Sequence, residues 1–132
     1  STQLARRIPN GTPLHIAQAK EERFISLAVG HSIRTVQDRL FLLSGIQPEI
    51  LLESHNFEAC RRLTLALGAV MLCPDAYVSR VPDLDLSEKL NAYPLLDGDM
   101  MRHFYLCCRR DMHFTRYMED FLLILRQELA QS

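Results

Sequence analysis

Two short polar segments carry the residue types that bind small polar ligands. Gly30-His31-Ser32 and Ser54-His55-Asn56 each combine a histidine with hydroxyl or amide side chains, and each opens a predicted helix. The free N–H groups and the dipole of a helix N-terminus favour anions, so both segments could hold a carboxylate or a small polar ligand. The same atoms serve as helix caps, and capping alone explains Ser32 and Asn56 equally well.

The histidines and cysteines leave an enzymatic alternative open. His31 and His55 could form a metal pair or supply a catalytic base, but no carboxylate stands at ligand spacing, so hydrogen-bonded loop histidines are favoured. Cys60 with His55 could be a nucleophile and its base, yet Cys60 falls on the inner face of its predicted helix, which indicates an inert core thiol. The sequence contains no G-x-S-x-G, glycine-rich phosphate loop or H-E-x-x-H. We therefore expect no catalytic residue, no metal and no cofactor.

The composition is that of an ordinary globular protein. The chain has 132 residues, of which 48% are hydrophobic and 23% charged, and its formal net charge is −1. This excludes a disordered chain and argues against nucleic-acid binding by these residues, because such binding requires a basic face. No signal-peptide pattern and no apolar run of about 18 residues occurs, so we expect a cytoplasmic protein without a membrane partner. The dibasic pairs are expected on a solvated face or in salt bridges between elements: Arg6-Arg7, Arg61-Arg62 and Arg109-Arg110.

The cysteines are expected to be reduced. Cys107 and Cys108 are adjacent, which suits neither a tetrahedral metal site nor an ordinary disulfide. Cys60, Cys73 and Cys107 lie in apolar contexts, so we expect core thiols in a reducing compartment.

A strand and a helix must position the first polar segment. Phe24–Leu27 predicts a short buried strand, and Ser32 is expected to cap the helix that follows. Gly45 lies just past this helix, where a left-handed residue is expected. The apolar face of the helix follows from residues at helical spacing: Ile33, Val36, Leu40 and Leu43.

A second strand and helix surround the other polar segment. The stretch 48–53 predicts a strand, and Asn56 is expected to cap a helix over Phe57–Leu67 that Gly68 ends. The inner face of this helix is predicted from its spacing: Phe57, Cys60, Thr64 and Leu67.

A third strand is predicted over 69–73, where Pro74 stops it. Two strand–helix–strand units in a row imply parallel strands buried on both faces. Residues 24–73 are therefore expected to form the core of an α/β lobe.

The remaining sequence predicts a loop, extended segments and a final helix. The stretch 81–86 is an acidic loop, 90–96 is expected to be extended, 97–98 is a turn signal, and 101–109 predicts a strand. An amphipathic C-terminal helix follows from apolar residues at helical spacing: Phe114, Met118, Phe121, Leu122, Leu125 and Leu129.

The stretch 24–53 resembles the effector-binding domain of LysR-type bacterial transcriptional regulators. That family shows a Phe-Ile strand, a loop with a small or polar tip, an Arg-containing helix that ends in Gly, and Pro-x-Ile at the start of a strand. Here these features are Phe24-Ile25, Gly30-His31-Ser32, Arg34, Gly45 and Pro48-Glu49-Ile50.

Further stretches extend the resemblance over nearly the whole chain: TPLHIAQAKEERFI, HNFEACRRLTLALGAVMLCP and YPLLDGDMMRHFYLCCRRD. In the last of these, Arg102 precedes the late strand. One departure is Leu67-Gly68-Ala69, where the family usually has Gly-x-Gly, and it concerns the shape of this loop.

The resemblance implies an α/β fold like that of type 2 periplasmic binding proteins, with two lobes and a small-molecule effector between them. Residues 1–20 would form a partial lobe I and a connector, 21–89 lobe II, and 90–132 the return to lobe I with the final strand and the C-terminal helix. No part of the sequence resembles the earlier portion of lobe I or the family's N-terminal winged helix-turn-helix.

The resemblance also implies which residues touch the effector: Gly30, His31, Ser32, Ser54, His55, Asn56, Gly68 and Pro74. We expect the domain to bind an anionic or polar molecule, with a carboxylate as one candidate. Binding would shift the arrangement of a homo-oligomer, a dimer or tetramer, that touches DNA only through the N-terminal domain. The alternatives are a stand-alone small-molecule binding protein of similar fold and, less favoured, an α/β enzyme.

Overall fold

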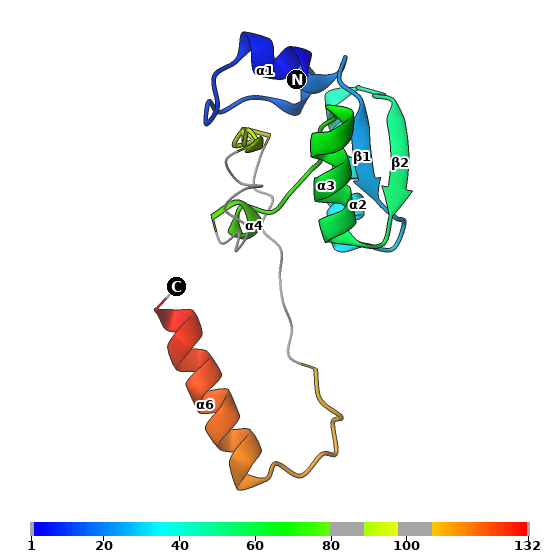
Figure 1. The fold of residues 1–132 in the computed structure, drawn as a ribbon. Helices are drawn as coiled ribbons and strands as arrows, with labels where there is room; N and C mark the ends of the chain where they lie inside the picture. The colour runs from blue at the N-terminus through cyan, green and yellow to red at the C-terminus, as the bar shows by residue number, and fades with distance from the viewer. Residues whose placement is uncertain (1, 80–88, 98–106, 132) are drawn as a thin grey trace. The chain divides into compact units, whose positions relative to one another are not determined.

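The computed structural model describes residues 2–79, 89–97 and 107–131 (Figure 1). They fall into two units, residues 1–100 and residues 101–132, here called unit 1 and unit 2. Unit 1 contains α1 (Gln3–Arg7), the 3-10 helix η1 (Ile16–Ala19), β1 (Phe24–Leu27), α2 (Ser32–Ser44), β2 (Ile50–Ser54), α3 (Phe57–Leu67) and α4 (Ala76–Ser79). Unit 2 contains α6 (Arg116–Ala130).

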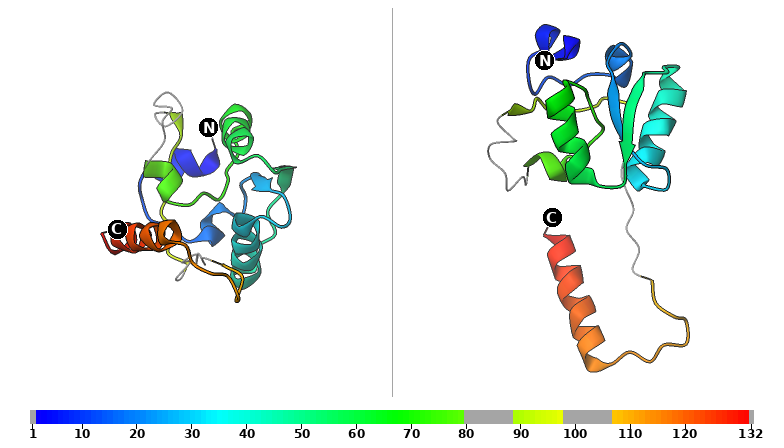
Figure 2. Two further views of the ribbon diagram at one scale, coloured as in Figure 1. Left: turned by 90° about the horizontal axis from the view of Figure 1, so that it is seen from below. Right: turned by 45° about the vertical axis from the view of Figure 1, so that its right-hand side comes forward.

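The strands β1 and β2 pair in parallel, which confirms the predicted α/β class. Ile25 lies opposite Leu52, and Leu27 lies opposite Ser54. Helices α2 and α3 cover opposite faces of the pair (Figure 2). All of β1 is buried, but β2 is not, and Leu52 is 39% exposed. The prediction that both strands are buried on both faces is therefore wrong for β2, which has one neighbouring strand among the described residues.

The predicted strand over 69–73 is wrong, although its first part does reach β1. Val70 forms an isolated parallel bridge with Phe24. Its carbonyl accepts from the N–H of Ile25 at 2.8 Å, and its N–H donates to the carbonyl of Arg23 at 2.9 Å. Residues 71–73 form no further bridge, and Pro74, which has no N–H to donate, follows them. β1 therefore lies between β2 and Val70.

The start of α2 differs from prediction by one residue. Ser32 is the first helical residue, and the N-cap is His31, whose backbone is extended and whose Nδ1 accepts from the N–H of Ile33 at 3.3 Å. Ser32 as cap is thus wrong, because the imidazole nitrogen one residue earlier meets the first free N–H. At α3 the prediction is confirmed, since Asn56 Oδ1 accepts from the N–H of Ala59 at 3.0 Å.

The ends of both helices are as predicted. Gly45 and Gly68 are the C-caps of α2 and α3, with φ of 63° and 58°. A left-handed residue at this position is strained for any side chain with a Cβ, which explains glycine at both sites.

Two apolar clusters form the core, one on each face of β1. Facing α2, the cluster is formed by Ile16, Ala19, Phe24, Leu40 and Ile46. The second cluster includes Cys60 of α3 and Ile33 from the first turn of α2, and is formed by Ile25, Leu27, Ile33, Cys60 and Ala69. Ser26 is also buried, and its hydroxyl accepts from Nε2 of the buried Gln37 at 2.7 Å.

The predicted apolar faces are too long at their C-terminal ends. Leu43 of α2 is 70% exposed and Leu67 of α3 is 45% exposed, so both are wrong as core residues. On α2 the buried face runs through Ile33, Gln37 and Leu40, so Leu43 lies off it although Phe41 in the same turn packs on Phe24. On α3 the buried residues end at Thr64, one turn before Leu67. Within α3, Cys60 and Thr64 are buried as predicted.

The later elements are confirmed in part. Residues 90–96 form no strand, and only Leu95 bridges in parallel to Leu14. The predictions for 81–86, for Gly98 and for 101–106, including Arg102, lie outside the described residues. Residues 107–109 are irregular. Cys107 is exposed, so its prediction as a core thiol is wrong, because no described element of unit 2 covers it.

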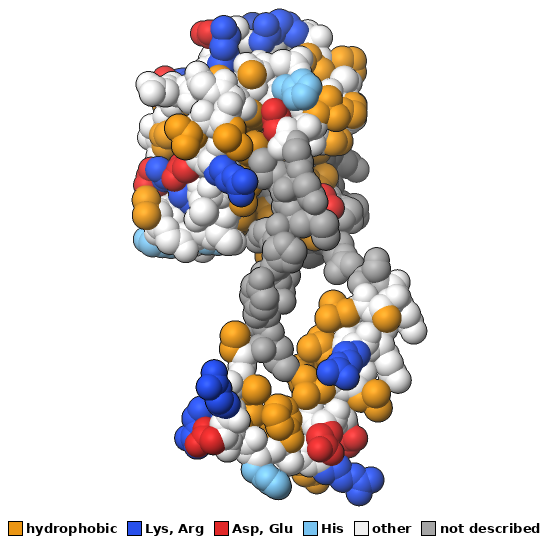
Figure 3. All heavy atoms as spheres, turned by 180° about the vertical axis from the view of Figure 1, so that it is seen from behind, with side chains coloured by type: hydrophobic (Ala, Val, Ile, Leu, Met, Phe, Trp, Pro, Cys, Tyr) orange, Lys and Arg blue, Asp and Glu red, His pale blue; other side chains and the backbone are white. Residues whose placement is uncertain are grey.

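The predicted C-terminal helix is confirmed as α6, but it has no buried residue. Hydrophobic side chains lie exposed along it, and Figure 3 shows them in orange. The most exposed are Tyr117 (86%), Leu129 (66%), Leu123 (57%), Ile124 (57%) and Phe121 (56%). No helix in the part of the chain that the structure describes is long and apolar enough to cross a membrane.

Candidate ligand site at the carboxyl edge of the strands

The two polar segments meet at one edge of the parallel pair. β1 and β2 run in the same direction, so their carboxyl ends lie side by side, and the N–H of Ala28 donates to the carbonyl of Ser54 at 3.0 Å. Helices α2 and α3 both begin at this edge. The fold therefore brings together the predicted residues of both segments, which are Gly30, His31, Ser32, Ser54, His55 and Asn56.

Gly68 does not join them. It ends α3 and precedes Val70, which bridges to Phe24 at the start of β1. Gly68 therefore lies at the amino edge of the strands, opposite to the other predicted residues. Pro74 comes after Val70, is half-buried and leads into α4.

Hydrogen-bond donors characterise this edge. Because His31 Nδ1 accepts from Ile33, the neutral ring carries its proton on Nε2, which can donate. Ser54 Oγ accepts from the N–H of Asn56 at 3.1 Å, and its hydroxyl hydrogen can donate either to the Cys60 sulfur, with which this side chain interacts, or to a ligand. Asn56 accepts through Oδ1, so its amide NH₂ is a further donor. The capping bonds thus orient these side chains and still allow them to donate to an oxygen acceptor.

Arg34 braces the same edge. Its Nη1 donates to Glu53 of β2 and, at 3.3 Å, to the carbonyl of Leu27 at the end of β1, while Nε donates to Asp38 at 2.7 Å. Hydrogen bonds to Glu53 and Asp38 raise the pKa of Arg34 above its ordinary value, so the guanidinium stays charged. Because two carboxylates balance this charge, Arg34 holds α2, β1 and β2 together and is poorly placed to receive an anion.

The rival nucleophile is buried. Cys60 has no exposed surface, and its Sγ faces the carbonyl of Ser26 at 3.6 Å and that of Ser54 at 4.0 Å. Burial raises the pKa of this thiol, which keeps it protonated, whereas His55 is exposed. Among the described residues, no group of three or more His, Cys, Asp and Glu side chains is arranged to hold a metal ion.

Arg61 is a functional candidate that the sequence reasoning missed. Its side chain on α3 is 9% exposed, and its Nη1 contacts Glu58 Oε2 at 3.3 Å. Its Nη2 is buried and has no hydrogen-bond partner. Both arginines of this dibasic pair contact Glu58 within α3, so these ion pairs are not the expected inter-element salt bridges, and a solvated face is wrong for Arg61. Its position beside Cys60 on the inner side of α3 is the signal that could have found it.

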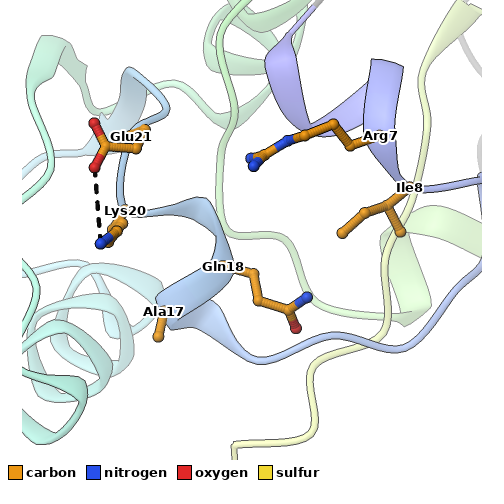
Figure 4. A pocket seen from close by; sticks show the side chains of 6 residues that line it. All are labelled: Arg7, Ile8, Ala17, Gln18, Lys20 and Glu21. Carbon is orange, nitrogen blue, oxygen red and sulfur yellow. Dashed lines mark ion pairs between the residues drawn. The ribbon is translucent and has the colours of Figure 1, made fainter.

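A shallow hollow of about 250 Å³ lies elsewhere in unit 1 (Figure 4). Its lining residues precede β1 and are Arg7, Ile8, Ala17, Gln18, Lys20 and Glu21. Lys20 Nζ and Glu21 Oε1 form an ion pair at 3.9 Å on its wall. No residue of the predicted ligand site lines this hollow.

A family model described as LysR substrate binding domain matches residues 3–130. The match spans every described strand and helix of both units. Neither the curated proteins nor the solved structures that were searched gave a match.

Proposed function

Because the chain belongs to the LysR substrate-binding domain family, we propose that it is the effector-sensing part of a LysR-type transcriptional regulator. Domains of this family are regulatory and have a periplasmic-binding-protein-like α/β fold, and the parallel strands of unit 1 agree with that fold. The observation that carries the proposal is the family match over residues 3–130. Within it, residues 1–20 would belong to lobe I and a connector, 21–89 to lobe II and 90–132 to the return to lobe I.

We place the effector at the carboxyl edge of β1 and β2. In open α/β sheets, ligands bind outside the carboxyl ends of the strands, where helix N-termini point. The donors of His31, Ser54 and Asn56 stand at this edge and suit a ligand that presents oxygen acceptors, such as a carboxylate. Gly30, Ser32, His55 and Pro74 complete the proposed contact set, and Gly68 is left out because it lies at the opposite edge.

The effector would act by a population shift. A ligand that binds one arrangement of the lobes better than another favours that arrangement by its difference in affinity. In a homo-oligomer this changes how the assembly holds DNA through the N-terminal domain. The exposed apolar side chains of α6 support association, since monomers rarely leave such a surface uncovered.

A thermal-shift screen tests the function. The chain is melted with small carboxylates, amino acids and aromatic acids, because a ligand of the folded state raises Tm by mass action. We expect at least one member to raise Tm in a concentration-dependent way. A folded chain whose Tm no member raises would contradict an anionic or polar effector.

Variants of the two serines test the location of the site. For a ligand from the screen, Ser32→Ala and Ser54→Ala should each weaken affinity about threefold to tenfold, the effect of one lost hydrogen bond. Ser44→Ala removes a hydroxyl at the opposite end of α2 and is the matched control. Unaltered affinity in both site variants would move the proposed site.

Self-association has its own test. Sedimentation or light scattering of the chain over a range of concentrations should reveal dimers or tetramers, and Phe121→Glu on α6 should weaken them. A monomer at the highest concentration would contradict association through this chain.

The rival functions are separated by the coding sequence upstream of Ser1. A winged helix-turn-helix there would support the regulator, and a signal peptide would support a stand-alone binding or transport protein. Turnover of a substrate that His55→Ala abolishes would favour the enzyme.

A further inference from the structure

The side chain of Arg61 has a buried donor with nothing to bind. It lies on α3, one helical turn after Phe57, and is 9% exposed. Nη1 meets Glu58 Oε2 at 3.3 Å, whereas Nη2 is buried without a hydrogen-bond partner. Nη2 is the one such side-chain atom among the residues that the structure describes. A guanidinium in this state has lost water at Nη2 without replacement, and buried polar groups are normally satisfied.

Its carboxylate partner is shared. Glu58 Oε2 faces Arg61, while Glu58 Oε1 accepts from Nε of Arg62 at 3.1 Å. Glu58 therefore offers Arg61 one carboxylate oxygen, which meets Nη1 and leaves Nη2 without a partner. The planar guanidinium binds carboxylates most strongly through two parallel N–H donors, and the unpartnered Nη2 supplies such a donor.

The guanidinium of Arg61 lies toward the N-terminal turn of α3, where it meets Glu58. Side chains of a helix tilt toward its N-terminus, and the contact with Glu58 in the first turn of α3 shows this direction for Arg61. That N-terminus begins at Asn56, at the carboxyl edge of β2, and its dipole favours an anion. On the same face of α3, the Phe57 ring packs on Tyr77 of α4 with the ring centroids 4.6 Å apart.

We propose that Arg61 is the anion receptor of this domain and takes the carboxylate of the effector through Nη2. The inference rests on the proposed function, because it identifies the chemical class of ligand for the same edge. Nη2 is buried, so binding requires a local opening around this end of α3. Donors from His31, Ser54 and Asn56 would then serve the rest of the ligand.

The test uses acetate, benzoate and sulfate as probes, each against chloride at equal ionic strength. Tm of the wild-type chain should rise with acetate or benzoate. In Arg61→Leu this rise should disappear, which corresponds to a loss of affinity of about tenfold to a hundredfold for a charge-assisted pair. Arg62→Leu changes the neighbouring, exposed partner of Glu58 and should keep the rise.

A second readout separates ligand binding from a structural role. In chloride, Arg61→Leu should keep Tm or raise it, because the substitution removes an unsatisfied buried charge. If Arg61→Leu does not fold, Arg61→Lys is the second variant. It keeps the charge but lacks the planar pair of N–H donors, so it should still lose most of the increase in Tm with acetate or benzoate.

Three results would overturn the inference. They are a rise that Arg61→Leu retains, a wild-type chain that neither carboxylate stabilises, and a Tm in chloride that falls by several degrees in Arg61→Leu. Stabilisation by sulfate alone would also exclude a carboxylate effector. The proposed function fails separately, when neither these anions nor the wider panel of amino acids and aromatic acids raises Tm.

Discussion

Units 1 and 2 both contain amphipathic helices, but they use them differently. In unit 1, α3 buries Cys60 and Thr64 against the side of β1. In unit 2, α6 is longer and carries a comparable apolar stripe, yet none of its residues is buried. The comparison shows that an apolar stripe is enough to predict a helix, whereas burial depends on a partner surface that the stripe does not specify.

Chemical labelling tests the contrast with the largest expected effect. Cys60 should react with a thiol reagent more slowly than Cys107 and Cys108, by at least on the order of a thousandfold, since it is exposed only when unit 1 opens. In urea all cysteines should react alike, which is the control. Rapid labelling of Cys60 in the folded chain would contradict its burial.

The raised pKa of Cys60 adds a pH dependence. The unfolded chain releases this proton at a lower pH than the folded chain does. This group's contribution to the free energy of unfolding is therefore complete below about pH 8.5 and falls as the pH rises above it. Cys60→Ala should remove this alkaline decrease in urea melts, and an unchanged decrease would assign it to other groups.

Truncation of isoleucine compares the two units directly. Ile25→Ala in fully buried β1 should lower the free energy of unfolding by about 2–5 kcal/mol, because it removes buried methylenes and leaves a cavity. Ile124→Ala on exposed α6 is the matched variant and should change it by less than about 0.5 kcal/mol. Equal costs in urea unfolding would show that α6 is covered in solution, for example by a second copy.

Substitutions of the helix caps should give the smallest difference in stability between the two units. Asn56→Ala should destabilise the chain by about 1 kcal/mol, because Asn56 Oδ1 satisfies the N–H of Ala59. Thr115 is the N-cap of α6 but makes no side-chain capping bond, so Thr115→Ala should cost only a few tenths of a kcal/mol. A larger loss for Thr115→Ala, measured by circular dichroism during urea unfolding, would reverse this ranking.

Local signals predicted the elements well where a single residue type decides the backbone. Gly45 and Gly68 end helices because a left-handed residue is required there, and Asn56 caps α3 through its own amide. The predictions were wrong where contacts with neighbouring residues or strands decide the structure. His31 takes the capping role from Ser32, and the stretch after Gly68 has strand-like composition but only Val70 bridges to β1.

The sequence predicted that the candidate site lies at the carboxyl edge of the strands, but it did not predict Arg61 as a candidate residue. The order of strand and helix was enough to bring Ser32 near Ser54, because parallel strands end together. The same topology separates Gly68 from them. Arg61 could not be found by rules of polarity, since an arginine in a sequence is expected in solvent and its 9% exposure depends on packing around α3.

The sequence by itself determined the family, the parallel α/β pattern and the amphipathic C-terminal helix, because these follow from the spacing and order of residue types along the chain. Tertiary structure alone decided which apolar residues are covered, which atom caps α2 and which guanidinium nitrogen is left without a partner. The physical reason is that burial and hydrogen-bond satisfaction are properties of contacts between segments, and no single segment contains them.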